Sequence, residues 1–255
     1  MPRPLVALAA AFGAVLVSGC AGNARHNPFL VPQASIYGSV KTIALAPIVV
    51  PRQLGSVEVE RAKFDSLITA DLRAAGFKVV SASQTEPIWS RVTDSPGGLF
   101  DASTGERDST KVRVARRLLM EQLVSRFQAD ALLHPHVVFA TARFNSGTAT
   151  WDGTRQSYQS FGGKLLRALF GQETYGKTPA LSLSLDIENL DGQELYINQG
   201  GLQLYEKPTD RDFAPVPASE LFSDTLRNAT AVHLALGPLV TRGVATIRPG
   251  TTSKN

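Results

Sequence analysis

Residues 41–50, Lys-Thr-Ile-Ala-Leu-Ala-Pro-Ile-Val-Val, predict a central β-strand around which the rest of the chain is arranged. The stretch is almost continuously apolar and rich in β-branched side chains, which is typical of a strand that is covered on both faces. Because proline has no backbone N–H to donate to a neighbouring strand, we expect the pairing to end near Pro47 or Pro51.

Two amphipathic helices are predicted after this strand, at 57–76 and 111–128, with a strand at 77–81, a short helix at 83–89 and a loop at 93–109 between them. We expect Gly76 to end the first helix and Ser109 or Thr110 to cap the second. The apolar side chains that recur at helical spacing are Phe64, Leu67, Ile68, Leu72 and Ala75 in the first helix, and Val112, Ala115, Leu119, Leu123 and Phe127 in the second.

The second half of the chain predicts strands and one more helix. Residues 130–144 predict a third strand, and residues 179–190 alternate between apolar and polar side chains, which predicts a strand with one exposed face. Asp191-Gly192 is typical of a hairpin turn that leads into a strand at 194–205. A last helix is predicted at 218–236, with Gly237-Pro238 as its stop.

The predicted order is therefore β-α-β-α-β, an insertion, and then β-β-α. Crossovers through helices favour parallel strands, and the later hairpin adds antiparallel ones. The sequence predicts an α/β (α+β) fold with a mixed β-sheet and helices packed on it. We expect this domain at 41–240, with an insertion at 145–178, a tether at 20–40 and a C-terminal tail at 241–255.

The N-terminus carries a targeting signal. Arg3 precedes an apolar stretch at 5–17, which is shorter than the about 20 residues that span a bilayer and has the length of a secretory h-region. Val17-Ser18-Gly19-Cys20 follows, and Cys20 is the one cysteine in the chain. The pattern resembles the lipobox of bacterial lipoproteins, in which the cysteine is lipidated and becomes the mature N-terminus.

The resemblance implies a signal peptide at 1–19 and a membrane anchor at Cys20. Ala21 stands where an aspartate favours inner-membrane retention in enterobacterial lipoproteins, so the resemblance implies an outer-membrane location, facing the periplasm. An ordinary signal peptide with an incidental cysteine is the alternative.

Composition and motifs favour binding over catalysis. The 255 residues are 43% hydrophobic and 19% charged, and the formal net charge of +4 is spread along the chain, which predicts a globular protein that does not bind nucleic acid. The sequence contains no Gly-x-Ser-x-Gly, no phosphate-binding glycine loop and no His-Glu-x-x-His. We therefore expect no enzymatic activity and no cofactor.

Two short features remain as candidate sites. His134 and His136 lie two residues apart on a predicted strand, so both imidazoles point to one face and could bind a metal ion if a third ligand were present. The alternative is two ordinary strand histidines.

The second candidate is an apolar stripe with basic flanks in the insertion, which suits a membrane surface or a protein partner, although it could also cover the domain's own core or be disordered. The stripe is Phe161, Leu165, Leu169 and Phe170.

Three segments carry a resemblance to a known group of proteins: residues 41–47, residues 72–80 (Leu-Arg-Ala-Ala-Gly-Phe-Lys-Val-Val) and residues 129–133 (Ala-Asp-Ala-Leu-Leu). Together with the hairpin around 190–195, they resemble the periplasmic α/β fold of the TolB N-terminal domain, CsgG, LpoB and PelC. The resemblance implies a role in envelope assembly or export, often as an oligomer.

The functional prediction combines these observations. We expect a membrane-anchored periplasmic lipoprotein that acts as a binding or assembly accessory, regulating an envelope enzyme or transporter. The alternative is a ring-forming component of a secretion or polysaccharide-export apparatus. The expected partners are the membrane, through the N-terminal lipid, an envelope protein, and further copies of the chain.

Overall fold

The computed structural model describes residues 27–55, 58–94, 98–101, 104–145, 147–157, 175–208 and 213–241. Its helices are α1 (Gln33–Ser39), α2 (Glu58–Ala74), α3 (Ala82–Asp94), α4 (Ser109–Phe127) and α6 (Thr225–Val240), with a short 3-10 turn at Arg52–Leu54. Its strands are β1 (Thr42–Leu45), β2 (Lys78–Val80), β3 (Ala131–Asn145), β4 (Thr148–Trp151), β5 (Thr154–Ser157), β6 (Tyr175–Asn189), β7 (Glu194–Leu204), β8 (Glu206–Pro208) and β9 (Phe213–Pro215).

A mixed sheet organises the molecule. β1 pairs in parallel with β2 and with the start of β3. The whole length of β3 pairs antiparallel with β6, and β6 pairs with β7. Near its end β3 also pairs with β4, which pairs with β5, so the sheet continues beyond the parallel part. The predicted mixed α/β fold is confirmed.

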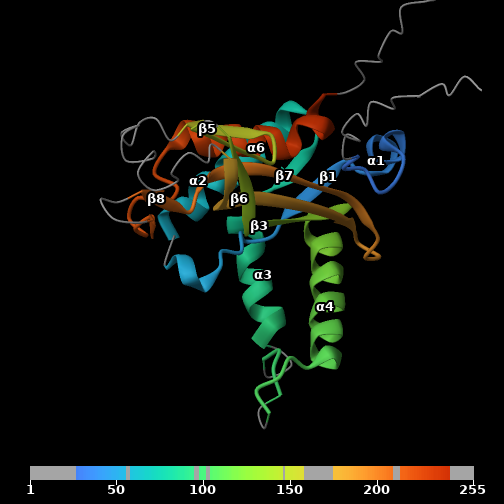
Figure 1. Cartoon of the computed structure of the whole chain (residues 1–255). Helices are drawn as coiled ribbons and strands as arrows, with labels where there is room; N and C mark the ends of the chain where they lie inside the picture. Colours follow the sequence, from blue (N-terminus) through green and yellow to red (C-terminus); the bar gives the residue numbers. More distant parts are fainter. Residues whose placement is uncertain are drawn as a thin grey trace, which may run out of the picture.

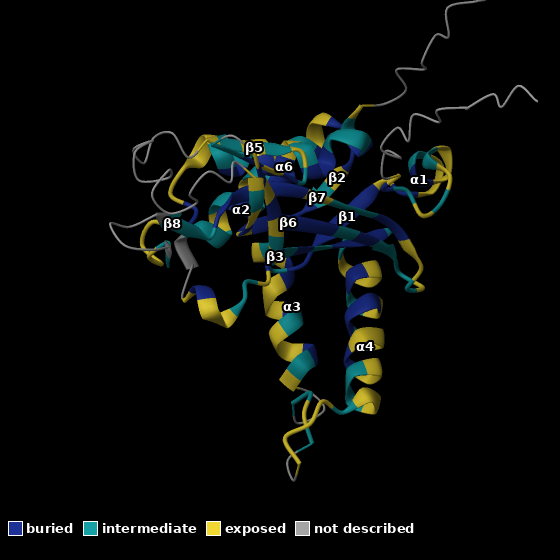
Figure 2. Ribbon diagram, in the orientation of Figure 1, coloured by how far each residue is buried: buried dark blue, intermediate teal, exposed yellow. Residues whose placement is uncertain are grey.

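Helices cover this sheet from two sides. Figure 1 shows α2 and α6 together on one face, while α3 and α4 form a hairpin that stands out from the other. The alternation along β1 explains this arrangement, because Ile43 and Leu45 pack in the core under α2 and α6, whereas Ala44 and Ala46 pack with α3 and α4. In Figure 2 β1 and the middle of β6 are buried, and the outer sides of α3 and α4 are exposed.

The close approach of α6 to the sheet depends on a glycine of β7. A Cβ placed on Gly200 would lie 2.0 Å from the carbonyl oxygen of Ala231 in α6. Any larger residue would therefore push the helix away from the strand. The Asp191-Gly192 turn is where the sequence predicted it, with Gly192 at a φ of +91°.

The segment at 27–40, predicted as part of a tether, belongs to the domain. Pro28 and Leu30 hydrogen-bond with β7, because Ile197 N donates to Pro28 O (2.9 Å) and Leu30 N donates to Leu195 O (3.0 Å). Ile36 of α1 is buried in the main core. The tether prediction is wrong for these residues, because their few apolar side chains pack although they show no periodicity.

Helix α6 continues through Gly237 and Pro238, so the predicted stop is wrong. Proline cannot donate the helical hydrogen bond to Leu234 O. Asn198 of β7 supplies a donor instead, because its Nδ2 lies 3.1 Å from Leu234 O. Two residues of α1 donate hydrogen bonds to backbone oxygens at the end of α6: Gln33 Nε2 donates to Pro238 O (3.1 Å) and the Tyr37 hydroxyl donates to Leu239 O.

Two further expectations differ from the structure. The middle of β6 is buried on both faces, with Ser182 at 0% and Ser184 at 5% exposure, and the Ser182 hydroxyl donates to the carboxylate of Asp152 after β4. Part of the predicted insertion is sheet, since β4 and β5 lie within 145–178 and bury Ala149 and Trp151.

Candidate functional site

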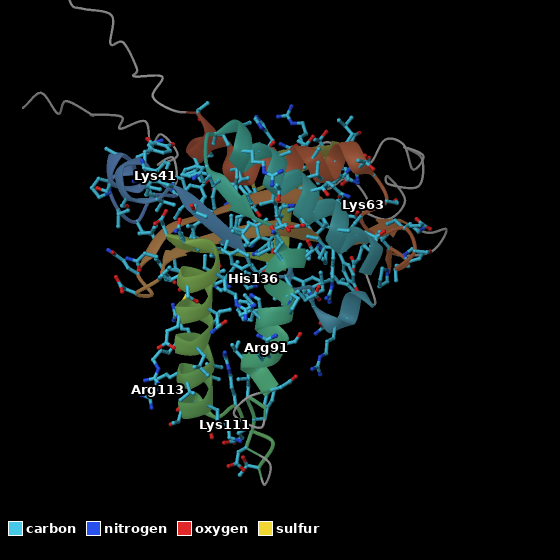
Figure 3. The ribbon with its side chains drawn as sticks, turned by 180° about the vertical axis from the view of Figure 1, so that it is seen from behind. Lys41, Lys63, Arg91, Lys111, Arg113 and His136 are labelled. Atoms are coloured by element: carbon cyan, nitrogen blue, oxygen red, sulfur yellow. The ribbon has the colours of Figure 1, made fainter. Side chains whose placement is uncertain are left out.

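A cluster of polar side chains lies on the sheet face from which α3 and α4 stand out. His134 and His136 of β3 point to this face, and the antiparallel register places His134 opposite Asp186 of β6. Glu188 follows two residues later on β6 and shares the same face. Figure 3 shows His136 at the sheet end of the hairpin, with Lys111 and Arg113 along α4 toward its far end.

Glu188 interacts with two basic side chains. His134 Nε2 lies 3.0 Å from Glu188 Oε1, and Arg116 of α4 donates to Glu188 Oε2. Burial alone would raise the pKa of Glu188, but the hydrogen bond with His134 and the nearby charges of His134 and Arg116 outweigh it, so the pKa lies below its ordinary value. The carboxylate therefore stays ionised and ties α4 to β6.

His136 lies beside the second carboxylate of β6, that of Asp186. Its Nε2 lies 3.8 Å from Asp186 Oδ2, and its ring stacks on that of His134 with centroids 6.2 Å apart. Ser184 Oγ donates to the other oxygen of Asp186 (3.0 Å). Burial lowers the pKa of His136; the Asp186 charge works against this and His134 adds to it.

From the sequence, His134 and His136 are candidate metal ligands that would need a third partner. In the ranges that the structure describes, no group of three or more His, Cys, Asp or Glu side chains is placed to hold a metal ion. Each histidine instead has a carboxylate of β6 beside its Nε2.

A cavity of about 260 Å³ opens beside this cluster, between α3 and α4. We call it the interhelical cavity. Its walls are mostly apolar, and the His134–Glu188–Arg116 cluster contributes to its lining. Trp89 of α3 also lines it and packs edge-on against His134, with ring centroids 6.1 Å apart. Trp89 Nε1 is buried, and among the described residues it has no hydrogen-bond partner.

The sequence prediction missed most of this cluster. The alternation at 179–190 places Asp186 and Glu188 on one face of their strand, and the structure agrees. Nothing in the sequence indicated that this face is the one that carries His134 and His136, because the register of β3 against β6 decides it. Trp89 and Arg116 belong to helices whose placement on the sheet could not be predicted from periodicity.

The other predicted site residues lie outside the described residues. They are Val17, Ser18, Gly19 and Cys20 of the lipobox, and Phe161, Leu165, Leu169 and Phe170 of the insertion. Among the helices of the described part, none combines the length and the apolar character that a membrane crossing requires.

Comparison with known proteins gives two structural likenesses. No family model matches the chain, and no curated protein matches it. Lipoprotein GNA1162 from Neisseria meningitidis is similar at 17% identity and a TM-score of 0.32, over 64% of this chain and 81% of that one. A PelC dodecamer from Paraburkholderia phytofirmans is similar at 11% identity and a TM-score of 0.36, over 84% of this chain and 95% of that one. These TM-scores are too low for either likeness to bear on the proposals below.

Proposed function

We propose that the protein is a lipid-anchored accessory protein of the bacterial cell envelope, which acts by binding at the periplasmic face of the outer membrane. The observation that carries the proposal is the position of Cys20, directly after an apolar stretch and Val17-Ser18-Gly19. Several acyl chains on that cysteine would supply about 0.8 kcal/mol of membrane affinity for each buried CH₂ group.

The way in which the chain enters the domain supports this role. Pro28 is hydrogen-bonded to β7, and only residues 21–27 separate it from Cys20. Eight peptide steps cover at most about 28 Å when fully extended. A lipid on Cys20 would therefore hold the β7 edge of the sheet within that distance of the bilayer.

Such an anchor acts through local concentration. Confinement to a membrane raises the effective concentration of the domain for any partner on the same membrane. The α3–α4 hairpin offers a surface for such a partner, because it stands out from the sheet with its outer sides exposed (Figure 2).

The anchor is tested by expressing the full chain in Escherichia coli with an alkyne-tagged fatty acid. We expect the wild-type protein to carry the label and C20A to carry none. S18A is the matched control, since it keeps a small residue before the cysteine and should remain labelled. A wild-type protein that is exported without the label, or a C20A protein that keeps it, would contradict the anchor.

The form of the accessory role is tested by the mass of the detergent-solubilised chain. A constant monomer mass across a concentration series supports a regulator of an envelope enzyme or transporter. A discrete oligomer supports the ring-forming export component instead, as would loss of that oligomer after substitution of Phe161 and Leu165.

A further inference from the structure

We propose that the interhelical cavity binds a small apolar carboxylate, with its apolar body between α3 and α4 and its carboxylate at the arginines of the hairpin. The inference concerns the folded domain and does not depend on a lipid at Cys20. It assigns a ligand class to a site that the envelope role leaves open.

The walls of the cavity set the size and polarity of the ligand. Buried Val92, Leu119, Met120 and Leu132 line it, and its volume is about 260 Å³. Apolar cavities of about 150 Å³ already bind benzene. The interhelical cavity therefore has room for one aromatic ring with a short chain.

The charges around the cavity favour an anion. Arg107, before α4, and Arg116, within α4, both belong to its lining. Glu188 is the one carboxylate there, and it is already engaged by His134 and Arg116. Helix α4 adds to the positive potential, because its ionisable side chains are Lys111, Arg113, Arg116, Arg117 and Arg126 against Glu121.

The guanidinium groups are the donors that the lining offers to a ligand. Trp89 Nε1 can only donate, but it is buried and presents no accessible N–H to the cavity. Thr93 also lines the cavity, but its Oγ1 already bonds to the backbone oxygens of Trp89 and Ser90. A carboxylate accepts hydrogen bonds and donates none when ionised, so it complements the guanidinium groups of Arg107 and Arg116.

The two tryptophans of the chain allow a direct test by NMR. The protein is residues 20–255 with C20A, which contains every described residue. The probe is 4-phenylbutyrate, and 4-phenylbutylamine is its control with the same apolar body and the opposite charge. Trp151 is an internal reference, because its Nε1 already donates to Leu181 O (3.1 Å) in the core. W89F assigns the two indole N–H signals.

We expect 4-phenylbutyrate to shift the Trp89 indole N–H signal in a saturable way, because Trp89 lines the cavity. The expected Kd is on the order of 1 mM for a ligand of this size. The Trp151 signal should stay in place, and the amine should bind at least about tenfold more weakly. R107Q should weaken the binding of 4-phenylbutyrate by about threefold or more, since it removes one charge-assisted hydrogen-bond donor from the exposed end of the cavity.

Filling the cavity gives the second line of evidence. Ala115 is buried in the cavity wall, and A115L should abolish the Trp89 shift. V114L is the matched control, because Val114 is exposed on the same helix, and it should leave binding unchanged. The proposal is overturned if 4-phenylbutyrate causes no saturable Trp89 shift, if the amine binds equally well, or if R107Q and a folded A115L both bind like the parent protein.

Discussion

His136 is a partly buried base whose protonation is coupled to folding. Its pKa lies below the ordinary value of 6.5, first because of burial, with Asp186 opposing and His134 reinforcing the shift. Between the lowered pKa of the folded chain and the value of 6.5 in the unfolded chain, the unfolded chain binds a proton that the folded chain does not. The free energy of unfolding therefore rises with pH across that interval and falls on acidification.

We expect the urea midpoint of the wild-type protein to fall as the pH is lowered from about 7.5 to about 5.5, and H136Q to reduce this pH dependence. Glu188 does not add to the pH dependence in this range. Its pKa lies below 4.5, so the stability that its ionised form contributes is lost only as the pH falls below that value. The measurement is urea unfolding across the pH series. An unchanged slope in H136Q contradicts the assignment.

At the scale of elements, the sequence predicted helix interiors better than helix ends. The apolar stripes located α2 and α4, since burial of a periodic face depends on many residues at once. The cap of α4 is Asp108, not Ser109 or Thr110, because its Oδ1 accepts from Thr110 N (2.8 Å) and Lys111 N (3.1 Å). The choice among adjacent capping residues depends on the backbone angles at one position, which a pattern does not contain.

We expect D108A to lower the free energy of unfolding by about 1 kcal/mol, because two backbone N–H groups at the start of α4 lose their acceptor. Urea unfolding followed by circular dichroism measures the change. S109A is the matched control and should be nearly neutral. If S109A is the more destabilising variant, the cap is not Asp108, and the position that the sequence predicted is correct.

At the scale of the whole molecule, the sequence could not predict which distant segments meet. The strand at 130–144 and the alternating strand at 179–190 were predicted separately, but their register, which brings His134 within reach of Glu188, is a property of the folded sheet. The same limit explains the segment at 27–40. Its contacts with β7 come from the backbone of Pro28 and Leu30, and its contacts with α6 come from the side chains of Gln33 and Tyr37. None of these residues belongs to a local pattern.

We expect I36A to lower the free energy of unfolding by about 2–5 kcal/mol, because Ile36 is 1% exposed and its loss would leave a cavity under α1. Urea unfolding measures this change, with exposed S35A as the matched control. A near-neutral I36A would mean that α1 is not part of the cooperative domain.

The contact between α1 and the end of α6 also determines when the fold can be completed. Gln33 and Pro238 are 205 positions apart, and contacts of such long sequence separation slow folding. If this chain is exported across a membrane with its N-terminus first, α1 can dock on the end of α6 only after Pro238 has crossed. Completion of the fold would then follow almost complete translocation.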